Sequence, residues 1–246
     1  MIIGSKLLFV NNLPSTNNYA ASLLKDNELS EGTVIYTNHQ STGRGQGGNK
    51  WESEDSKNLL ISIVLFPSMI IPAEQFFLSM AISLGICDFL DRYTSSVSIK
   101  WPNDIYVNND KIAGILIENS IMGNLIEHTV AGIGININQA KFLGNAPNPV
   151  SLLNLTGKEY NLPECLSQLV SDLDKRYKSL ISGDVALIKT HYLSRLYRNG
   201  QWFKYQGLKG IFTGRIVNVS DTGRLQVERE DGFISEYAFK EIDFIL

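Results

Sequence analysis

Apolar positions in the first 198 residues recur in two periods, one typical of strands and one typical of helices. Apolar or β-branched runs at residues 7–10, 33–37 and 59–66 predict strands, and we expect the first at a sheet edge. Helical spacing predicts helices over residues 15–25 and 73–93, and the second is apolar enough to be the main core helix. Strands and helices therefore share one N-terminal unit.

The same reasoning extends to the end of that unit. Four further strands and two further helices are expected, the strands at residues 97–100, 105–107, 112–118 and 126–137 and the helices at residues 163–181 and 184–197. Asn108-Asn109-Asp110 reads as a turn, which predicts that the second and third of these strands form a hairpin.

The pattern changes after Gly200. Residues 201–246 alternate apolar and polar positions in short runs divided by glycine turns, which favours a small β-barrel or curled sheet. We expect two domains, residues 1–198 and 199–246. The second should pack on the first, because so short a segment cannot bury a large core of its own.

Composition narrows the class of protein without identifying it. With 43% hydrophobic and 19% charged positions among 246 residues, the chain suits a globular fold rather than a disordered or collagen-like one. Lys and Arg total 22 against 25 Asp and Glu, a net charge of −3 with no basic block, so we do not expect duplex DNA as a partner. Two distant cysteines, no signal peptide and no unbroken apolar span favour a reducing cytoplasm over secretion or a membrane.

A glycine-rich polar loop over residues 40–51 separates two predicted strands and carries Arg44 and Lys50. Glycines let backbone N–H groups turn toward an anion, and the two cations would match a phosphate or carboxylate. The loop has no following helix, as a dinucleotide fingerprint needs, and Asn49 stands where a P-loop needs lysine. An ordinary surface loop remains the alternative.

Two further segments would support an anion site. Lys100 ends an apolar strand directly before Trp101-Pro102-Asn103-Asp104, where it would reach into a cleft or simply lie exposed at an edge beside a common turn. Gly132 and Gly134 alternate along a predicted strand and would leave one face bare for a flat ligand. A packing site or a bulge explains these two glycines equally well.

In combination and in this order, the segments resemble the biotin-protein ligases, also described as biotin-[acetyl-CoA-carboxylase] ligases. The resemblance covers nearly the whole chain and rests on Ser15-Thr16-Asn17, Gln40 with Gly43-Arg44-Gly45 and Trp51, Lys100-Trp101-Pro102-Asn103-Asp104, Lys111-Ile112-Ala113-Gly114-Ile115-Leu116 and Gly132-Ile133-Gly134-Ile135-Asn136. It implies an α+β catalytic domain of the class II synthetase-like type, with a mixed sheet flanked by helices and followed by a C-terminal SH3-like β-barrel. It also implies the form without an N-terminal DNA-binding domain, since the first predicted strand begins near Leu7.

The resemblance implies an AMP-forming ligase that uses ATP and biotin as substrates. Biotin's carboxylate would attack the α-phosphate of Mg-ATP to give biotinyl-5'-AMP and pyrophosphate, and a carrier lysine would then attack the mixed anhydride. Mg²⁺ would be held mostly by water and phosphate oxygens, so we assign it no protein ligands. The expected partner is the biotin carrier domain of a biotin-dependent carboxylase, and edge strands leave a homodimer open.

The same resemblance assigns roles to individual residues. Arg44 and Lys100 would be catalytic, because their cations offset charge on the carboxylate and the α-phosphate. The expected biotin-binding residues are Ser15, Thr16, Asn17, Gln40, Gly43, Lys100, Gly114, Gly132 and Gly134. The expected adenylate-binding residues are Arg44, Gly45, Gln46, Trp51, Asn103 and Asn136.

The loop departs from the family pattern at Gln46 and Asn49, where arginines are typical. We hypothesise that the enzyme holds the biotinyl-adenylate less tightly, because a neutral amide replaces a charge-assisted contact. Two alternatives stay open: a lipoate-protein ligase, which shares the fold and the acyl-adenylate chemistry, and a non-catalytic module that binds biotin or a nucleotide. The biotin-type segment at residues 100–104 disfavours the first, and intact Arg44 and Lys100 disfavour the second.

Overall fold

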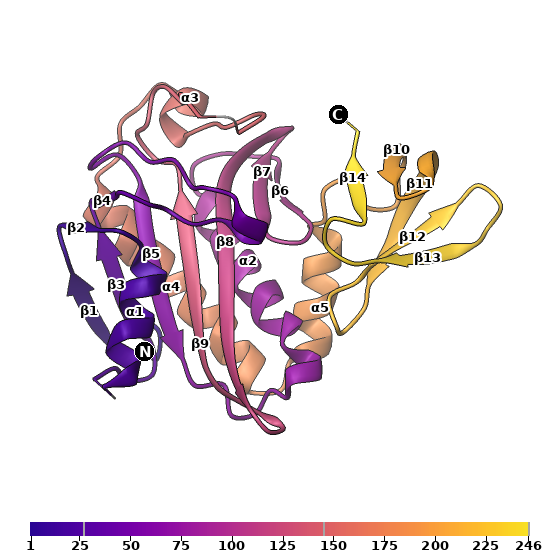
Figure 1. Ribbon diagram of the computed structural model, residues 1–246. Coiled ribbons are helices and arrows are strands. Elements are labelled where there is room, and N and C mark those ends of the chain that lie inside the picture. Colours follow the sequence, from indigo (N-terminus) through magenta and orange to yellow (C-terminus); the bar gives the residue numbers. More distant parts are fainter. Residues whose placement is uncertain (27, 145, 246) are drawn as a thin grey trace.

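A seven-stranded sheet organises the computed structural model, which describes residues 1–26, 28–144 and 146–245 (Figure 1). Its strands lie in the order β1-β3-β5-β9-β8-β7-β6. They span Lys6–Phe9 (β1), Thr33–Thr37 (β3), Leu59–Leu65 (β5), Val97–Lys100 (β6), Asp104–Val107 (β7), Asp110–Met122 (β8) and Leu125–Ile135 (β9). Because β1 and β3 pair in parallel and the other neighbours pair antiparallel, the sheet is mixed, which confirms the predicted α+β class.

The two faces of the sheet are covered by different helices. Side chains alternate along a strand, so Ile61 and Ile63 of β5 face one way while Ser62 and Val64 face the other. The first face packs on α2 (Phe76–Leu90), and α4 (Leu162–Ile181) and α5 (Val185–Ser194) pack on α2 in the same hydrophobic core. Helix α1 (Thr16–Lys25) covers the second face, as Figure 1 shows. It packs there in a second, smaller hydrophobic cluster.

Helix α2 is the core helix that the apolar pattern predicts, shortened at both ends. The 3₁₀ turn Pro72–Glu74 (η2) precedes it, and the helix then runs over Phe76–Leu90. Among the described helices, the stretch Pro72–Leu90 is long and apolar enough to cross a membrane, yet 67% of it is buried inside the fold. Its apolar surface is thus already covered by the sheet and by α4.

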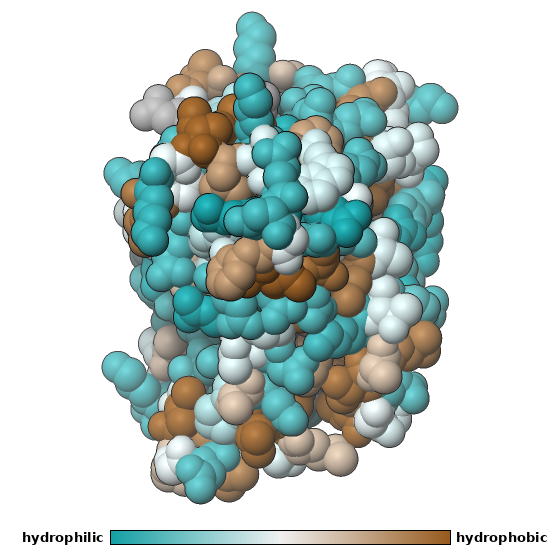
Figure 2. Space-filling view, turned by 90° about the vertical axis from the view of Figure 1, so that its right-hand side faces the viewer, coloured by the Kyte–Doolittle hydropathy of each residue, from teal (hydrophilic) through white to brown (hydrophobic). Residues whose placement is uncertain are grey.

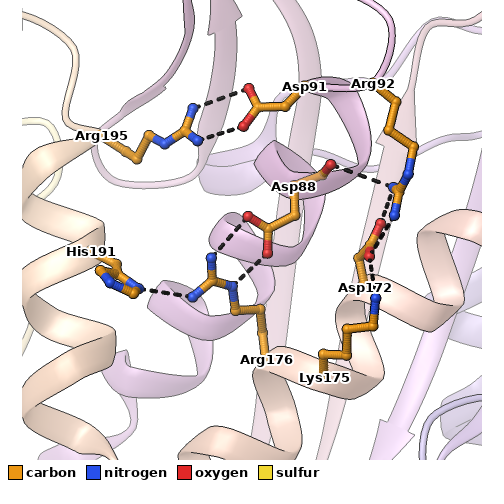
Figure 3. Close-up of polar contacts among 8 residues, drawn as sticks. All are labelled: Asp88, Asp91, Arg92, Asp172, Lys175, Arg176, His191 and Arg195. Carbon is orange, nitrogen blue, oxygen red and sulfur yellow. Dashed lines mark hydrogen bonds and ion pairs between the residues drawn. The ribbon is translucent and has the colours of Figure 1, made fainter.

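Ion pairs join α2, α4 and α5, as Figure 3 shows. Arg92, just after α2, forms a bidentate pair with Asp172 of α4, and Arg176 of α4 pairs with Asp88 of α2 at 2.5 and 2.8 Å. Asp91 pairs with Arg195 at the end of α5. These ion pairs link α2 to both α4 and α5.

The C-terminal part forms a second, five-stranded sheet in the order β13-β12-β11-β10-β14. Its strands are Trp202–Gly207 (β10), Gly210–Val219 (β11), Leu225–Arg229 (β12), Ile234–Tyr237 (β13) and Ile242–Phe244 (β14). Its buried side chains belong to the same hydrophobic cluster as α2 and α4, so the two parts share a core. Figure 2, viewed from this side, shows hydrophobic surface broken up by hydrophilic residues.

Sequence patterns identified the long elements and missed the short ones. Helix α3 (Leu152–Thr156) was not predicted, although Ser151 and Asn154 form a capping box and Gly157 ends the helix in the left-handed region. The two-residue strands β2 (Asn12–Leu13) and β4 (His39–Gln40), which pair with each other, were also missed. Elements this short carry too little periodicity to stand out.

Candidate active site

A pocket of about 120 Å³ opens on the α1 face of the sheet. Residues from every segment that resembles the ligases meet there, although they are far apart in the chain. The predicted site residues that line it are Thr16, Asn17, Gln40, Arg44, Gly45, Gln46, Trp51, Asn103, Gly114, Gly132 and Gly134. Ser15, Gly43, Lys100 and Asn136 do not line it.

The first turn of α1 forms one wall of the pocket. Ser15 is the N-cap by backbone geometry, but its side chain makes no capping hydrogen bond. Instead Gln40 Oε1 accepts hydrogen bonds from the backbone N–H of Thr16 at 2.8 Å and from its hydroxyl at 3.1 Å. A side chain from another segment thus satisfies the helix end and fixes it beside the glycine loop.

The glycine loop folds back on itself above the sheet. Arg44 and Lys50 form an antiparallel bridge, and the Gly45 N–H donates to the Asn49 carbonyl at 2.7 Å. Between them a 3₁₀ turn over Gln46–Gly48 (η1) requires Gly47 in the left-handed region, at φ 67°. Both cations line the pocket, so the loop presents positive charge to it.

Side chains of the protein cover the glycine strands, which corrects the expectation of a bare face. A Cβ at Gly114 or Gly134 would collide with the Trp51 ring, and a Cβ at Gly132 would collide with the Asn17 amide. The glycines therefore make room for Trp51 and Asn17 to lie directly on the backbone of β8 and β9. In this structure a ligand would contact those two side chains before it reached the sheet.

Two cations that line the pocket, Arg44 and Lys111, form ion pairs with carboxylates. Glu118 of β8 accepts two hydrogen bonds from Arg44, at 2.6 and 3.1 Å. Asp104 pairs with Lys111 at 2.6 Å, and Lys111 Nζ lies 5.7 Å from the centre of the Trp51 ring. An arriving anion would therefore meet two cations, Arg44 and Lys111, whose positions carboxylates already fix.

Lys100 lies outside the pocket, between the two sheets. Its ammonium donates to the Tyr106 hydroxyl at 3.0 Å and lies 5.4 Å from the centre of the Phe244 ring of β14. Burial lowers the pKa of Lys100, while the nearby Asp104 carboxylate opposes that shift. In the backbone register of β6 and β7, Lys100 lies opposite Asp104. Because Asp104 lines the pocket, Lys100 is the neighbour of a lining residue.

Three predicted adenylate residues bury a polar atom that has no hydrogen-bond partner in the described part of the chain. These atoms are Gln46 Oε1, Trp51 Nε1 and Asn136 Oδ1. The Asn136 amide nitrogen is engaged, since it donates to the Val150 carbonyl at 3.0 Å. Gln46 and Trp51 line the pocket, so their two polar atoms are available to a polar ligand, whereas Asn136 lies outside the lining.

Several residues that line the pocket are absent from the predicted set, among them Lys111 and Phe239, and so is Glu118 beside it. The sequence includes Lys111 in a segment that resembles the ligases but assigns it no role. Phe239 reaches the pocket from the C-terminal part, which no local sequence pattern indicates. Glu118 follows Gly114 by four residues on β8, so the strand period of two is the signal that could have placed it on the pocket face. Across the described ranges, no group of three or more His, Cys, Asp or Glu side chains could hold a metal ion.

Comparisons with known proteins identify the family of this chain. Residues 9–136 match the Biotin/lipoate A/B protein ligase family, and this segment contains all the predicted site residues. A biotin–[acetyl-CoA-carboxylase] ligase of Paracoccus denitrificans is 31% identical over 195 residues, which cover 76% of this chain and 79% of that protein. The bifunctional ligase/repressor BirA of Bacillus subtilis is 27% identical over 245 residues, which cover 96% and 74%.

Solved structures give the same answer for the fold. The biotin protein ligase from Aquifex aeolicus, in complex with biotin and ATP, superimposes with a TM-score of 0.80 at 27% identity. The match covers 97% of this chain and 98% of that one, so it includes the C-terminal sheet. With more than half of its length matched by the family model, the chain belongs to the biotin/lipoate A/B protein ligase family.

Proposed function

We propose that this protein activates biotin with ATP and transfers it to a lysine of a biotin carrier domain. Its relatives are ligases for biotin, and the similar Aquifex aeolicus enzyme was solved with biotin and ATP. The enzyme is thus an AMP-forming biotin-[acetyl-CoA-carboxylase] ligase, with biotin and ATP as substrates.

One observation carries the proposal for the site. The start of α1, the glycine loop and the glycine strands line a single pocket, which contains cations and unpartnered polar atoms side by side. An acyl-adenylate combines an apolar acyl part, a negative phosphate and a polar base, so it needs this mixture of groups. A purely apolar or purely acidic pocket would not accept it.

In the first half-reaction a biotin carboxylate oxygen attacks the α-phosphorus of ATP, the bond to the bridging oxygen breaks, and pyrophosphate leaves. We propose that Ser15, Thr16, Asn17 and Gln40 orient biotin, and that Arg44 offsets charge on the reacting oxygens. Lys50 and Lys111 line the same pocket and add positive charge. Lys100 would contribute once its ammonium leaves Tyr106 and turns toward Asp104.

In the second half-reaction the carrier lysine amine attacks the acyl carbon, an amide bond forms and AMP leaves with the bonding electron pair. The protein itself supplies no nucleophile, because the amine comes from the carrier. We propose that Gln46, Trp51, Asn103 and Asn136 hold the adenylate, since three of them bury polar atoms that lack partners among the described residues. The expected partner is the carrier domain of a biotin-dependent carboxylase.

Mg²⁺ would enter with ATP. The described residues offer no cluster of acidic or histidine ligands, which suits a metal held by phosphate oxygens and water. The ion would supply further charge neutralisation at the phosphates. We therefore assign the binding of the nucleotide, and not of the metal, to the residues of the pocket.

We further propose that residues 199–246 form an SH3-like domain beside a catalytic domain of residues 1–198. The five-stranded sheet and its contacts with the glycine loop support this division. We also propose a cytoplasmic location, which the two buried free thiols Cys87 and Cys165 suit. A homodimer and the exclusion of DNA stay predictions.

The test is to mix the protein with Mg-ATP, an apo carrier domain and either biotin or lipoate, and to weigh the carrier. We expect a mass increase of one biotinyl group with biotin alone, strongly reduced in both Arg44→Ala and Lys100→Ala. Addition of lipoate instead would establish the lipoate-ligase alternative. Tight biotin binding without any mass increase would establish the non-catalytic alternative.

A further inference from the structure

Glu118 joins two walls of the pocket through one carboxylate. Its Oε1 accepts from Arg44 Nη2 at 2.6 Å, and its Oε2 accepts from Arg44 Nη1 at 3.1 Å and from Asn17 Nδ2 at 2.8 Å. Arg44 belongs to the glycine loop, Asn17 to α1 and Glu118 to β8. No other carboxylate among the described residues touches both Arg44 and Asn17.

The contact leaves one edge of the Arg44 guanidinium for a ligand. A guanidinium has five N–H donors. Glu118 takes one hydrogen from each terminal nitrogen, and Asn18 Oδ1 takes the second hydrogen of Nη1 at 2.6 Å. Within the described residues, Nε and the second hydrogen of Nη2 have no acceptor. Those two donors form a fork that matches a carboxylate or phosphate.

Asn17 is fixed even more completely. Its side chain is buried, and it lies over Gly132 where any Cβ would displace it. Its amide hydrogens go to Glu118 and to the Leu116 carbonyl at 3.2 Å, and its Oδ1 accepts from Ser62 at 2.6 Å. Rotation of the Asn17 amide would break all three hydrogen bonds. Glu118 is one of the three partners, so it helps to fix the orientation of this amide.

We infer that Glu118 is a positioning residue for the adenylation step: it holds Arg44 with the Nε–Nη2 edge turned to the anionic group of the substrate and holds Asn17 over Gly132. The inference rests on the proposed function and extends it to a residue beyond the assigned pocket. The carboxylate lowers the net positive charge near Arg44, so its benefit is orientation rather than attraction. Fixed geometry contributes to kcat, because it acts on the bound reactants.

The contact contributes little to folding, which makes it testable. The Arg44 and Glu118 side chains are 42% and 40% exposed, and ion pairs with that exposure add little to stability. Glu118→Gln keeps the shape and one acceptor oxygen, whereas Glu118→Ala removes the contact. Glu127→Ala is the matched control, because Glu127 lies on the neighbouring strand, bonded to Ser120 and outside the pocket.

The experiment measures pyrophosphate release with Mg-ATP and biotin, and the thermal midpoint of each variant. We expect Glu118→Ala to lower kcat about tenfold and Glu118→Gln less, with midpoints close to wild type and no effect of Glu127→Ala. In an Arg44→Ala background the loss from Glu118→Ala should shrink to about twofold, because the two residues act as one unit.

Two outcomes would overturn the inference while leaving the proposed function intact. One is an active wild type in which Glu118→Ala lowers the rate equally in both backgrounds, which would indicate a merely structural role. The other is tighter substrate binding with unchanged kcat in Glu118→Ala, which would mean that Glu118 only competes for Arg44. A wild type that releases no pyrophosphate would instead overturn the proposed function, and this inference with it.

Discussion

At the scale of single residues, a small set of side chains decides how the pocket holds its contents. Gln46 lines the pocket on the 3₁₀ turn of the glycine loop, and its Oε1 is buried without a partner in the part of the chain that is described. The family pattern has an arginine there. An amide offers two donors and no charge, so a phosphate gains a weaker contact from it.

We predict that Gln46→Arg slows release of the biotinyl-adenylate about tenfold when no carrier is present, since a charge-assisted hydrogen bond adds about 1.5 kcal/mol. The measurement is dissociation of labelled adenylate from the preloaded enzyme. Gln201→Arg adds the same charge at an exposed position outside the pocket lining and should leave the rate unchanged. Equal release by Gln46→Arg and wild type would refute the hypothesis.

At the scale of elements, the helices that support the sheet depend on a few buried charges. The Asp172 side chain is only 4% exposed, and Arg92 binds both of its oxygens (Figure 3). Burial by itself raises the pKa of Asp172, but hydrogen bonds and charge from Arg92 and Lys175 outweigh it and hold the pKa below its usual value. The ionised carboxylate therefore stabilises the packing of α4 on α2.

We predict that Asp172→Asn lowers the free energy of unfolding by about 2 kcal/mol at pH 7, since it weakens hydrogen bonds to a charged, buried group. Because the folded pKa is the lower one, this stabilisation is present above the unfolded pKa of about 3.9 and is lost as the pH falls through the folded pKa. Urea unfolding of both proteins between pH 7 and pH 3 measures the difference.

Lys175→Ala serves as the control for that series. Its side chain is 69% exposed and its Nζ lies 3.3 Å from Asp172, so its removal should cost about 0.5 kcal/mol or less. A stability difference between wild type and Asp172→Asn that persists unchanged to pH 3 would contradict the prediction. It would mean that shape, and not charge, holds the two helices together.

At the scale of the whole molecule, the C-terminal sheet touches both loops of the candidate site. Trp101 Nε1 donates to the Gly223 carbonyl at 2.9 Å, and Lys240 Nζ donates to the Gly47 carbonyl at 3.1 Å. Phe244 covers the Lys100 ammonium from the same side. The small sheet therefore shapes the surroundings of the residues from which we expect catalysis.

We predict that Phe244→Ala moves the alkaline limb of the pH profile of adenylation kcat to higher pH. Burial lowers the pKa of Lys100 in the intact protein, so that limb should lie below the ordinary lysine value of about 10.4. Loss of the ring admits water, which stabilises the ammonium and moves the limb toward that value. The measurement is kcat against pH for both proteins.

Phe233→Ala removes a 65% exposed ring from the same sheet and should not move the limb. If the limb lies at the ordinary lysine value in wild type, or if Phe244→Ala leaves it in place, Lys100 is not the group that titrates.

The sequence by itself determined most of what is local. The apolar periods located α1, α2, α4 and the long strands within a few residues, because a helix or strand buries one face and must repeat that pattern. The order of the segments around Arg44, Lys100 and Gly132 also predicted the family. Most of the site residues that this resemblance implies do line one pocket.

Only the tertiary structure decided which side chains meet. It laid Trp51 on Gly114 and Gly134, and it brought Glu118 to Arg44, which is 74 residues away in the chain. It also turned Lys100 toward the C-terminal sheet rather than into the pocket. A local pattern fixes the backbone conformation and the face of a strand. The partner of a charged or aromatic side chain depends on packing between distant segments, which no local pattern records.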